Sequence, residues 1–304
     1  MSTTATFHYL DTASAPAGLV RHWGKVGENS YSYKSQPVSR TVHNLRDEPA
    51  ASEFTTDSAG FALLRWPSAE KAFVDDAAVR AGYYADMEAV LRANCEALAS
   101  NAGATNNKVR KVVIFDHTIR RPGGPRGPFQ QVHVDQTAAA SVARVRRHLP
   151  AEEADELLKH RFQLINVWRP IGHPATDHPL AVVDWRSTAP GDFVPVDLLF
   201  RKSGEEGEKA AVSSDEFSTE GYEARGATMG VAARDEHRFY YVKDMTPEEV
   251  LLLKCYDSWG EGEPGGKKGL AVYTPHSAFE DPATPADAKP RESIEVRALV
   301  FYEE

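Results

Sequence analysis

The chain has 304 residues, of which 41% are hydrophobic and 10% aromatic, so it can bury the core of one large domain. Its 35 basic and 44 acidic residues give a formal net charge of −9, which favours solubility and provides no basic field to attract nucleic acid or an anionic membrane. The two cysteines, Cys95 and Cys255, form no C-x-x-C pair, which predicts a reduced, cytoplasmic setting. We expect neither a secretory signal nor a membrane-spanning segment.

The N-terminal part of the chain, residues 1–107, is expected to be irregular or helical and to pack on the remainder. It contains short strand candidates at 4–9 and 60–66. The clearest helix is predicted over 75–100, where apolar residues fall near a common stripe and two aspartates favour the N-terminal end. This part is expected to belong to one domain that spans residues 1–304.

Residues 108–304 are expected to be rich in strands. Helices are predicted over 137–149 and 151–160, broken at Pro150. Strands are predicted over 111–119, 130–137, 162–171, 178–187, 192–200, 237–245, 250–259, 269–279 and 293–302. Early helices followed by many short strands predict an α+β protein whose largely antiparallel sheets close into a barrel or jelly roll. The charged, Gly- and Ser-containing segment 202–235 is predicted to be a mobile insertion that acts as a lid.

The stretch QQVHVDQT, residues 130–137, places an imidazole and a carboxylate on one face of a predicted strand. Successive side chains of a strand point to opposite faces, so His133 and Asp135 point the same way while Val132 and Val134 face a packed sheet. Two histidines and one carboxylate hold ferrous iron in many oxygenases and leave the opposite face open. The H-x-D pair predicts two of these ligands, and a surface strand pair is the alternative.

A third ligand would have to come from another strand. His276 follows an alternating apolar run near the C-terminus and is the favoured candidate, while His117 and His237 also lie beside strands and stay open. Downstream, alternation in the last predicted strand places Arg291 and Ser293 on one face. An arginine and a hydroxyl spaced in this way could hold the far carboxylate of a small dicarboxylate, with a solvated strand face as the alternative.

These stretches together resemble the Fe(II)/2-oxoglutarate-dependent oxygenases, and more narrowly the fungal hydroxylase/desaturase group. That group includes relatives of aspergillic acid hydroxylase and gibberellin GA4 desaturase, and a meroterpenoid endoperoxide-forming oxygenase. The sequences that carry the resemblance are VHVDQT, INVWRPI, PLAVVDWRS, HRFYYVKDMTPEEVLLLKCYDS, YTPHSAFEDP and PRESIEVRALVF. They cover most of residues 108–304.

The resemblance implies a double-stranded β-helix, or jelly-roll, core with flanking helices. It implies that His133, Asp135 and His276 bind Fe(II) and that Arg291 and Ser293 face the cosubstrate 2-oxoglutarate. Because the interval from His276 to Arg291 is longer than the usual gap, Arg297 is a rival for the carboxylate.

The expected activity is therefore that of a dioxygenase that uses Fe(II), 2-oxoglutarate and dioxygen. It would hydroxylate, desaturate or otherwise oxidise a small secondary-metabolite intermediate. The alternatives are a facial-triad oxidase that does not consume 2-oxoglutarate, a zinc hydrolase with the same ligands, and a catalytically silent β-barrel binding protein. The expected partner is a small-molecule substrate, with neither nucleic acid nor membrane, and a homodimer is an open alternative to a monomer.

Overall fold

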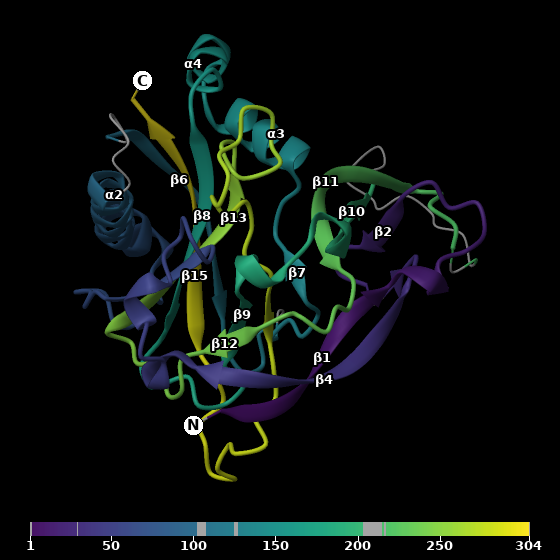
Figure 1. Cartoon of the computed structure of the whole chain (residues 1–304), viewed down its shortest axis with the longest axis horizontal. Coiled ribbons are helices and arrows are strands. Elements are labelled where there is room, and N and C mark those ends of the chain that lie inside the picture. Colours follow the sequence, from purple (N-terminus) through teal and green to yellow (C-terminus); the bar gives the residue numbers. More distant parts are fainter. Residues whose placement is uncertain are drawn as a thin grey trace.

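The computed structural model describes residues 2–28, 30–101, 108–124, 127–202, 215 and 217–303, and these form two sheets that face each other (Figure 1). The five-stranded sheet has the order β5 (Phe61–Arg65), β13 (Glu249–Asp257), β8 (Phe162–Pro170), β15 (Ser293–Tyr302) and β6 (Val109–Arg120). The ten-stranded sheet has the order β1 (Thr3–Asp11), β4 (Lys34–Asn44), β12 (Phe239–Tyr241), β9 (Leu180–Val183), β14 (His276–Ala278), β7 (His133–Val134), β11 (Tyr222–Val231), β10 (Phe193–Arg201), β2 (His22–Lys25) and β3 (Ser30–Tyr31).

The described helices lie outside the sheets. They are α1 (Asp76–Ala78), a π-helical turn (Val79–Tyr83), α2 (Tyr84–Asn101), α3 (Ala138–His148) and α4 (Ala151–Leu157), with single 3-10 turns at Thr12–Ser14, Leu45–Asp47, Ala51–Glu53, Trp185–Ser187 and Pro190–Asp192. The predicted helix over 75–100 is confirmed as one helical run, whose N-terminus is capped by the Asp75 carboxylate. None of the described helices is long and apolar enough to cross a membrane.

Strand β15 has an apolar outer face and an inner face that is polar near the start of the strand and apolar near its end. Its outer residues, Ile294, Val296, Ala298 and Val300, are fully buried in a core shared with Met87, Val90 and Leu91 of α2. On the inner face, Leu299 and Phe301 join an apolar cluster with residues of α3 and α4. The inner positions nearer the start of β15 are Ser293, Glu295 and Arg297, and Arg291 lies two positions before the strand, so a polar patch faces the space between the sheets.

Two expectations for the N-terminal and insertion segments are wrong. The N-terminal part is not mainly irregular, because β1 and the unpredicted β4 pair over nine residue positions and extend the larger sheet. The segment 202–235 is not a loose insertion throughout, because residues 222–231 form β11, which pairs with both β10 and β7. The remaining core of the predicted lid, 203–214 and 216, lies outside the described residues. Neighbouring strands supplied the backbone hydrogen bonds that local composition did not indicate.

The strand predicted over 269–279 is also shorter than expected. Only His276–Ala278 forms a strand, β14, and residues 270–275 are irregular. These irregular residues are nonetheless buried from Ala271 to Pro275, and the backbone N–H of Ala271 donates to the Asp57 carbonyl at 2.8 Å. The apolar alternation in this stretch therefore reflects burial between other elements and not membership of a sheet.

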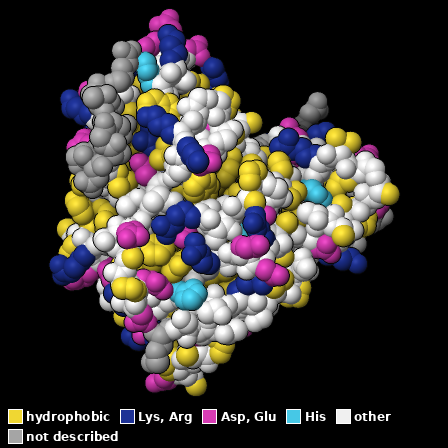
Figure 2. All heavy atoms as spheres, viewed as in Figure 1, with side chains coloured by type: hydrophobic (Ala, Val, Ile, Leu, Met, Phe, Trp, Pro, Cys, Tyr) yellow, Lys and Arg dark blue, Asp and Glu magenta, His cyan; other side chains and the backbone are white. Residues whose placement is uncertain are grey.

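On the face of the molecule that Figure 2 shows, basic and acidic side chains are interspersed over the body. The figure also shows a lobe set apart from the body, which corresponds to the region of β2, β10 and β11 in Figure 1.

Candidate metal centre

Two short strands bring the candidate ligands together. Strands β7 and β14 pair antiparallel, with His133 directly opposite His276, and Asp135 immediately follows β7. Cross-strand partners lie about 5 Å apart at Cβ, which brings the two imidazoles side by side. The ring centroids of His133 and His276 are 4.4 Å apart. The pairing of these two strands, which lie more than 140 positions apart in sequence, therefore creates the site.

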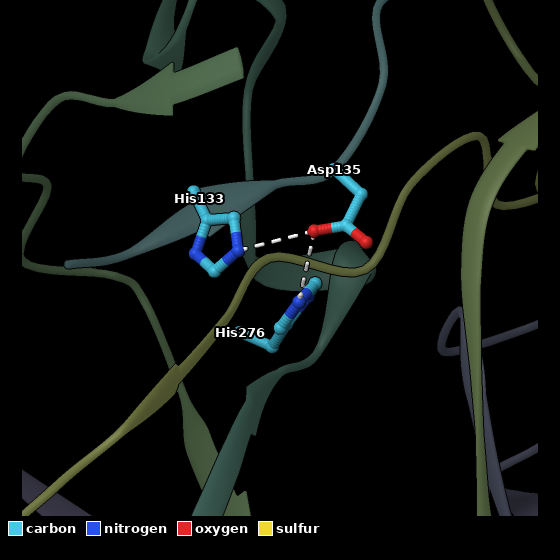
Figure 3. A group of neighbouring side chains, drawn as sticks. All are labelled: His133, Asp135 and His276. Carbon is cyan, nitrogen blue, oxygen red and sulfur yellow. Dashed lines mark ion pairs between the residues drawn. The ribbon is translucent and has the colours of Figure 1, made fainter. Parts of the chain in front are cut away.

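The ligand atoms of His133, Asp135 and His276 converge on one point (Figure 3). One ligand atom from each residue lies within 4.8 Å of the others. Asp135 Oδ1 is 3.2 Å from His133 Nε2 and 3.7 Å from His276 Nε2. His276 is buried, and the side chains of His133 and Asp135 are each 15% exposed, so the site is shielded from water but open on one side.

Backbone carbonyls fix the orientation of both imidazoles. His133 Nδ1 lies 2.8 Å from the Gln131 carbonyl, and His276 Nδ1 lies 3.0 Å from the Thr274 carbonyl. Because a carbonyl oxygen only accepts, each Nδ1 carries a proton, and in a neutral imidazole Nε2 then presents a lone pair. Two lone pairs and a carboxylate oxygen that converge in this way repel one another unless a cation lies between them. The donor set therefore fits a metal ion with nitrogen and oxygen ligands.

The second oxygen of Asp135 is held by two further side chains. Asp135 Oδ2 accepts a hydrogen bond from Asn166 Nδ2 at 2.8 Å and one from Arg297 Nε at 3.1 Å. Burial would raise the pKa of Asp135, but the Arg297 guanidinium holds this pKa well below its ordinary range. Asn166 and Arg297 thus fix an ionised carboxylate with Oδ1 directed at the histidines.

His276 is in the protonation state that a ligand needs. Burial, followed by repulsion from the neighbouring His133, lowers the pKa of the His276 imidazole to about 4. The imidazole is therefore neutral at physiological pH and can offer its lone pair to a metal.

Arg291 and Ser293 lie on the same inner face as this cluster. Arg291 is buried, donates from Nη1 to the His178 carbonyl at 2.7 Å, and lies over the Trp168 ring with its guanidinium carbon 5.6 Å from the centroid. Its Nε has no hydrogen-bond partner among the described residues. Burial, and then the nearby Arg120, lowers the pKa of Arg291 to about 10. This buried cation lacks a carboxylate within bonding distance in the described part of the chain.

Arg297, the rival carboxylate binder, has each of its nitrogens engaged. Besides Asp135, it contacts Thr118 Oγ1 at 2.9 Å, Asp116 at 3.5 Å and the Glu295 carboxylate. Both Asp135 and Glu295 are carboxylates, so Arg297 has already satisfied the charge-assisted bonding that a dicarboxylate would offer. Its contacts assign it to the support of Asp135.

The two rival histidines are engaged elsewhere. His117 contacts the Tyr84 hydroxyl at 2.8 Å and pairs with Asp76 at 3.3 Å. His237 is buried between Tyr9 and Asp192, at 3.1 Å and 3.0 Å. Neither joins the cluster around Asp135.

Alternation in the sequence places Asn166 and Trp168 on one face of a strand, which is the signal for both residues, and it leaves a pocket role and a satisfied core amide open for Asn166. The structure places Asn166 Nδ2 on the Asp135 carboxylate. Phe129, whose ring contacts His133 edge-on at 4.8 Å between centroids, lies in a Pro/Gly-rich connection that gave no such signal.

Comparison with known proteins gives a consistent result. Residues 7–301 match the family described as "Oxidoreductase/YMDC permease-like domain". The hydroxylase/desaturase efuI of Hormonema carpetanum is 30% identical over 99% of this chain and 95% of that protein. The Fe(II)/2-oxoglutarate-dependent dioxygenase nvfI of Aspergillus novofumigatus is 31% identical over 91% of this chain and 88% of that protein.

Solved structures agree with these sequence matches. A structure of the iron and alpha-ketoglutarate-dependent endoperoxidase NvfI superposes with a TM-score of 0.72 at 26% identity, covering 99% of this chain and 98% of that one. A second structure of that endoperoxidase gives a TM-score of 0.71.

Proposed function

The chain belongs to the family of the Oxidoreductase/YMDC permease-like domain, within the fungal hydroxylase/desaturase group of Fe(II)/2-oxoglutarate-dependent oxygenases. From this family membership we propose which residues bind the metal and which bind the cosubstrate. The protein is an oxidoreductase that uses Fe(II), 2-oxoglutarate and dioxygen to hydroxylate, desaturate or otherwise oxidise a small secondary-metabolite intermediate. The zinc hydrolase, the oxidase that does not consume 2-oxoglutarate and the silent binding protein are therefore not favoured.

We assign the core to a double-stranded β-helix. Along the chain, β6, β7, β8 and β9 alternate between the two sheets, and β12, β13, β14 and β15 alternate again. Within the sheets these eight strands form two blocks, β13-β8-β15-β6 and β12-β9-β14-β7. This interleaving of an early and a late set of four strands is the pattern of a jelly roll. Strands β10 and β11 are an insertion between the two sets, which extends one side of the barrel.

The iron ligands of this proposal are His133, Asp135 and His276. The observation that carries the assignment is the convergence of the Nε2 atoms of both histidines and Asp135 Oδ1, which is the donor set that a metal ion with nitrogen and oxygen ligands requires. When bound, the iron supplies the redox chemistry that couples oxidation of 2-oxoglutarate by dioxygen to oxidation of the substrate. The chain itself orients both imidazoles through the Gln131 and Thr274 carbonyls and keeps Asp135 ionised.

The cosubstrate carboxylate is assigned to Arg291, with Ser293 beside it. Support comes from Arg291 Nε, which has no hydrogen-bond partner among the described residues, and from the engagement of Arg297 by two carboxylates. Asn166, which holds Asp135, and Trp168, which lies under Arg291, occupy consecutive inner positions of β8. Such positions are about 7 Å apart, so a five-carbon dicarboxylate can extend from the metal to Arg291.

A cytoplasmic location and a homodimer stay predictions. Cys95 and Cys255 are both free and buried, in keeping with a reduced setting. The division into an N-terminal part and a barrel within one domain is likewise retained as a prediction.

Metal analysis and succinate release test the proposed function together. Protein purified without oxygen is expected to bind one Fe(II) and to release succinate from 2-oxoglutarate when oxygen is admitted. A preference for zinc with no succinate release would contradict the proposal. Iron binding without any 2-oxoglutarate consumption would contradict the cosubstrate assignment alone.

A further inference from the structure

The loop between β8 and β9, residues 171–179, contains two His-Pro dipeptides with different backbone conformations. His178, which precedes Pro179, has a φ of 45°, in the left-handed region that residues other than glycine rarely occupy. Proline disfavours this conformation further, because the residue before a proline is biased toward extended backbone angles. His173, which precedes Pro174, has no positive φ. The backbone of His178 is therefore strained, and that of His173 is not.

Contacts with distant segments hold the loop on both sides of the strained residue. Before it, the backbone N–H of Ala175 donates to the Met245 carbonyl at 2.8 Å. After it, the Pro179 carbonyl accepts from the backbone N–H of Phe279 at 3.2 Å. A strained backbone persists only where its surroundings over-determine it, and such positions cluster at ligand-binding sites. The conformation of His178 is thus fixed by tertiary contacts.

This conformation directs the His178 carbonyl at Arg291, the residue that we assign to the cosubstrate. Arg291 Nη1 donates to the carbonyl at 2.7 Å. The preceding Asp177 accepts from the backbone N–H of Arg291 at 3.4 Å through Oδ2, and its Oδ1 lies 2.6 Å from His178 Nδ1. Residues 177 and 178 therefore contact Arg291 at both its backbone and its guanidinium group.

Two contacts fix the orientation of the Arg291 guanidinium. Its carbon lies 5.6 Å from the centroid of the Trp168 ring, and Nη1 is bound to the His178 carbonyl. The buried Nε has no hydrogen-bond partner among the described residues. Because the donors of a guanidinium lie in one rigid plane, a contact that fixes Nη1 also fixes the direction of the N–H at Nε. The His178 carbonyl therefore determines where Arg291 can receive a carboxylate.

We propose that His178 is a positioning residue for the cosubstrate, whose left-handed backbone holds Arg291 in the orientation that binds the far carboxylate of 2-oxoglutarate. The inference rests on the proposed function, in which Arg291 binds this carboxylate. The role belongs to the backbone of residue 178 and not to its imidazole. A residue that tolerates the left-handed region can therefore replace His178, whereas a β-branched residue cannot.

Substitutions that differ in backbone preference test the inference. Protein loaded with Fe(II) is titrated calorimetrically with 2-oxoglutarate under nitrogen, so that binding is measured apart from turnover. His178→Val should weaken 2-oxoglutarate binding about tenfold, and His178→Gly and His178→Asn should recover most of this affinity although both lack the imidazole. His173→Val, the matched change before the other proline of the loop, should bind 2-oxoglutarate as wild type does.

A milder variant keeps this comparison available if His178→Val does not fold. His178→Ala and His178→Gly differ by a single methyl group, which disfavours the left-handed region in alanine and is absent in glycine. His178→Ala should therefore bind 2-oxoglutarate more weakly than His178→Gly, by a smaller factor than His178→Val.

Two further measurements show whether His178 acts through Arg291. Oxalate can chelate the iron but is too short to reach Arg291, so His178→Val and wild type should bind it equally. In an Arg291→Ala background, His178→Val should cause no additional loss of 2-oxoglutarate affinity, because the donor that it misplaces is absent. A general disturbance of the barrel would instead weaken oxalate binding and would add to the loss caused by Arg291→Ala.

Three results would overturn the inference. Equal 2-oxoglutarate affinity in wild type, His178→Val and His178→Ala would show that the backbone of residue 178 does not orient Arg291. An equal loss in the glycine, asparagine and valine variants would assign the effect to the imidazole. Weaker oxalate binding in His178→Val would show that the loop supports the metal centre and not the cosubstrate.

Titration of Arg291→Ala separates a failure of this inference from a failure of the proposed function. If wild-type protein did not bind 2-oxoglutarate, the proposed function would fail. If Arg291→Ala bound 2-oxoglutarate as tightly as wild type, the cosubstrate assignment would fail, and the role of His178 with it. A loss in Arg291→Ala without any loss in His178→Val would leave the proposed function intact and overturn the inference alone.

Discussion

Asp135 and Asp257 are two shielded carboxylates with similar supporting side chains and different surroundings. Asp135 is held by an arginine, Arg297, and an amide, Asn166. Asp257 is also held by an arginine, Arg161, whose Nη2 lies 2.6 Å from Oδ2, and by an amide, Gln163, at 2.7 Å. The surroundings of Asp135 and Asp257 differ in the groups that contact the Oδ1 atom of each carboxylate.

Both oxygens of Asp257 are saturated by donors. Its Oδ2 also accepts from Lys254 Nζ at 2.7 Å, and its Oδ1 accepts from Arg161 Nε and from the backbone N–H of Trp259. Asp57 pairs with the same lysine and arginine at 2.9 Å each, which balances two cations against two carboxylates. The side chain of Asp257 is fully buried. This network is closed and leaves no position for a ligand.

Asp135, in contrast, keeps Oδ1 facing only the two imidazole nitrogens. Lysine and arginine carry protons that occupy carboxylate lone pairs, whereas a neutral imidazole held by a carbonyl brings a lone pair of its own. An arginine and an amide beside a carboxylate therefore do not distinguish a structural carboxylate from a ligand. The distinguishing feature is an oxygen that meets acceptors instead of donors.

The largest effect is expected when one of the three candidate metal ligands around Asp135 is removed. His133→Ala, Asp135→Ala and His276→Ala should each reduce succinate release below detection and abolish stoichiometric Fe(II) binding, because the remaining donors no longer surround the ion. Circular dichroism should show that the barrel stays folded. Normal iron content and turnover in His276→Ala would show that another residue supplies the third ligand.

The network around Asp257 should respond in the opposite way, with a loss of stability and no loss of iron affinity. Lys254→Met leaves the buried Asp257 and the partly buried Asp57 with one cation fewer, and should lower the free energy of unfolding by about 3–5 kcal/mol. Urea denaturation measures this loss. The Fe(II) affinity of the folded fraction should be unchanged. A Lys254→Met variant that is stable yet fails to bind iron would contradict the purely structural role of the network around Asp257.

Variants of Arg291 and Arg297 should separate binding of the cosubstrate from positioning of the metal ligand Asp135. Arg291→Ala should raise the KM for 2-oxoglutarate roughly tenfold to hundredfold through loss of a charge-assisted pair, with little change in iron affinity. Arg297→Ala should instead weaken iron binding, because Asp135 loses a donor. Parallel titrations of cosubstrate and metal decide the matter, and a larger KM effect in Arg297→Ala would reverse the assignment.

A matched pair of variants, one at the amide beside Asp135 and one at the amide beside Asp257, tests the same difference with smaller expected effects. Asn166→Ala should weaken Fe(II) binding about tenfold, because a partner that orients a ligand is lost. Gln163→Ala should leave iron binding intact and lower the free energy of unfolding by about 1–3 kcal/mol, since it removes a donor to a buried carboxylate. Similar iron affinities in the two variants would mean that Asn166 does not position Asp135.

The smallest effect is expected in the pH dependence of stability. Burial would raise the pKa of Asp257, but Lys254 and Arg161 overcome it and hold this pKa well below its ordinary range. A carboxylate with a lowered folded-state pKa stabilises the protein above its unfolded pKa, about 4, and this contribution is lost as the pH falls toward the folded value. The unfolding free energy should therefore fall below about pH 4, and less steeply in Asp257→Asn. An equal slope in that variant would assign the acid sensitivity to other carboxylates.

The direction of side chains within individual elements could be predicted from the sequence. Alternation placed His133 with Asp135, and it separated Arg291, Ser293 and Arg297 from the apolar side of the last strand, because side-chain direction in a strand depends only on residue parity. The spacing of apolar residues also identified the long helix over 75–100. Family likeness added iron and 2-oxoglutarate, which no spacing alone could establish.

Which of these faces meet depends on the tertiary structure. The proposed choice of His276 over His117 and His237 rests on the pairing of β14 with β7, and the proposed choice of Arg291 over Arg297 rests on the contacts of Arg297 with Asp135 and Glu295. The difference between Asp135 and Asp257 likewise arises from partners distant in sequence. Local periodicity records which way a side chain points, whereas its function here depends on which strands hydrogen-bond and which charges they bring together. That information resides in long-range contacts, which no short stretch of sequence contains.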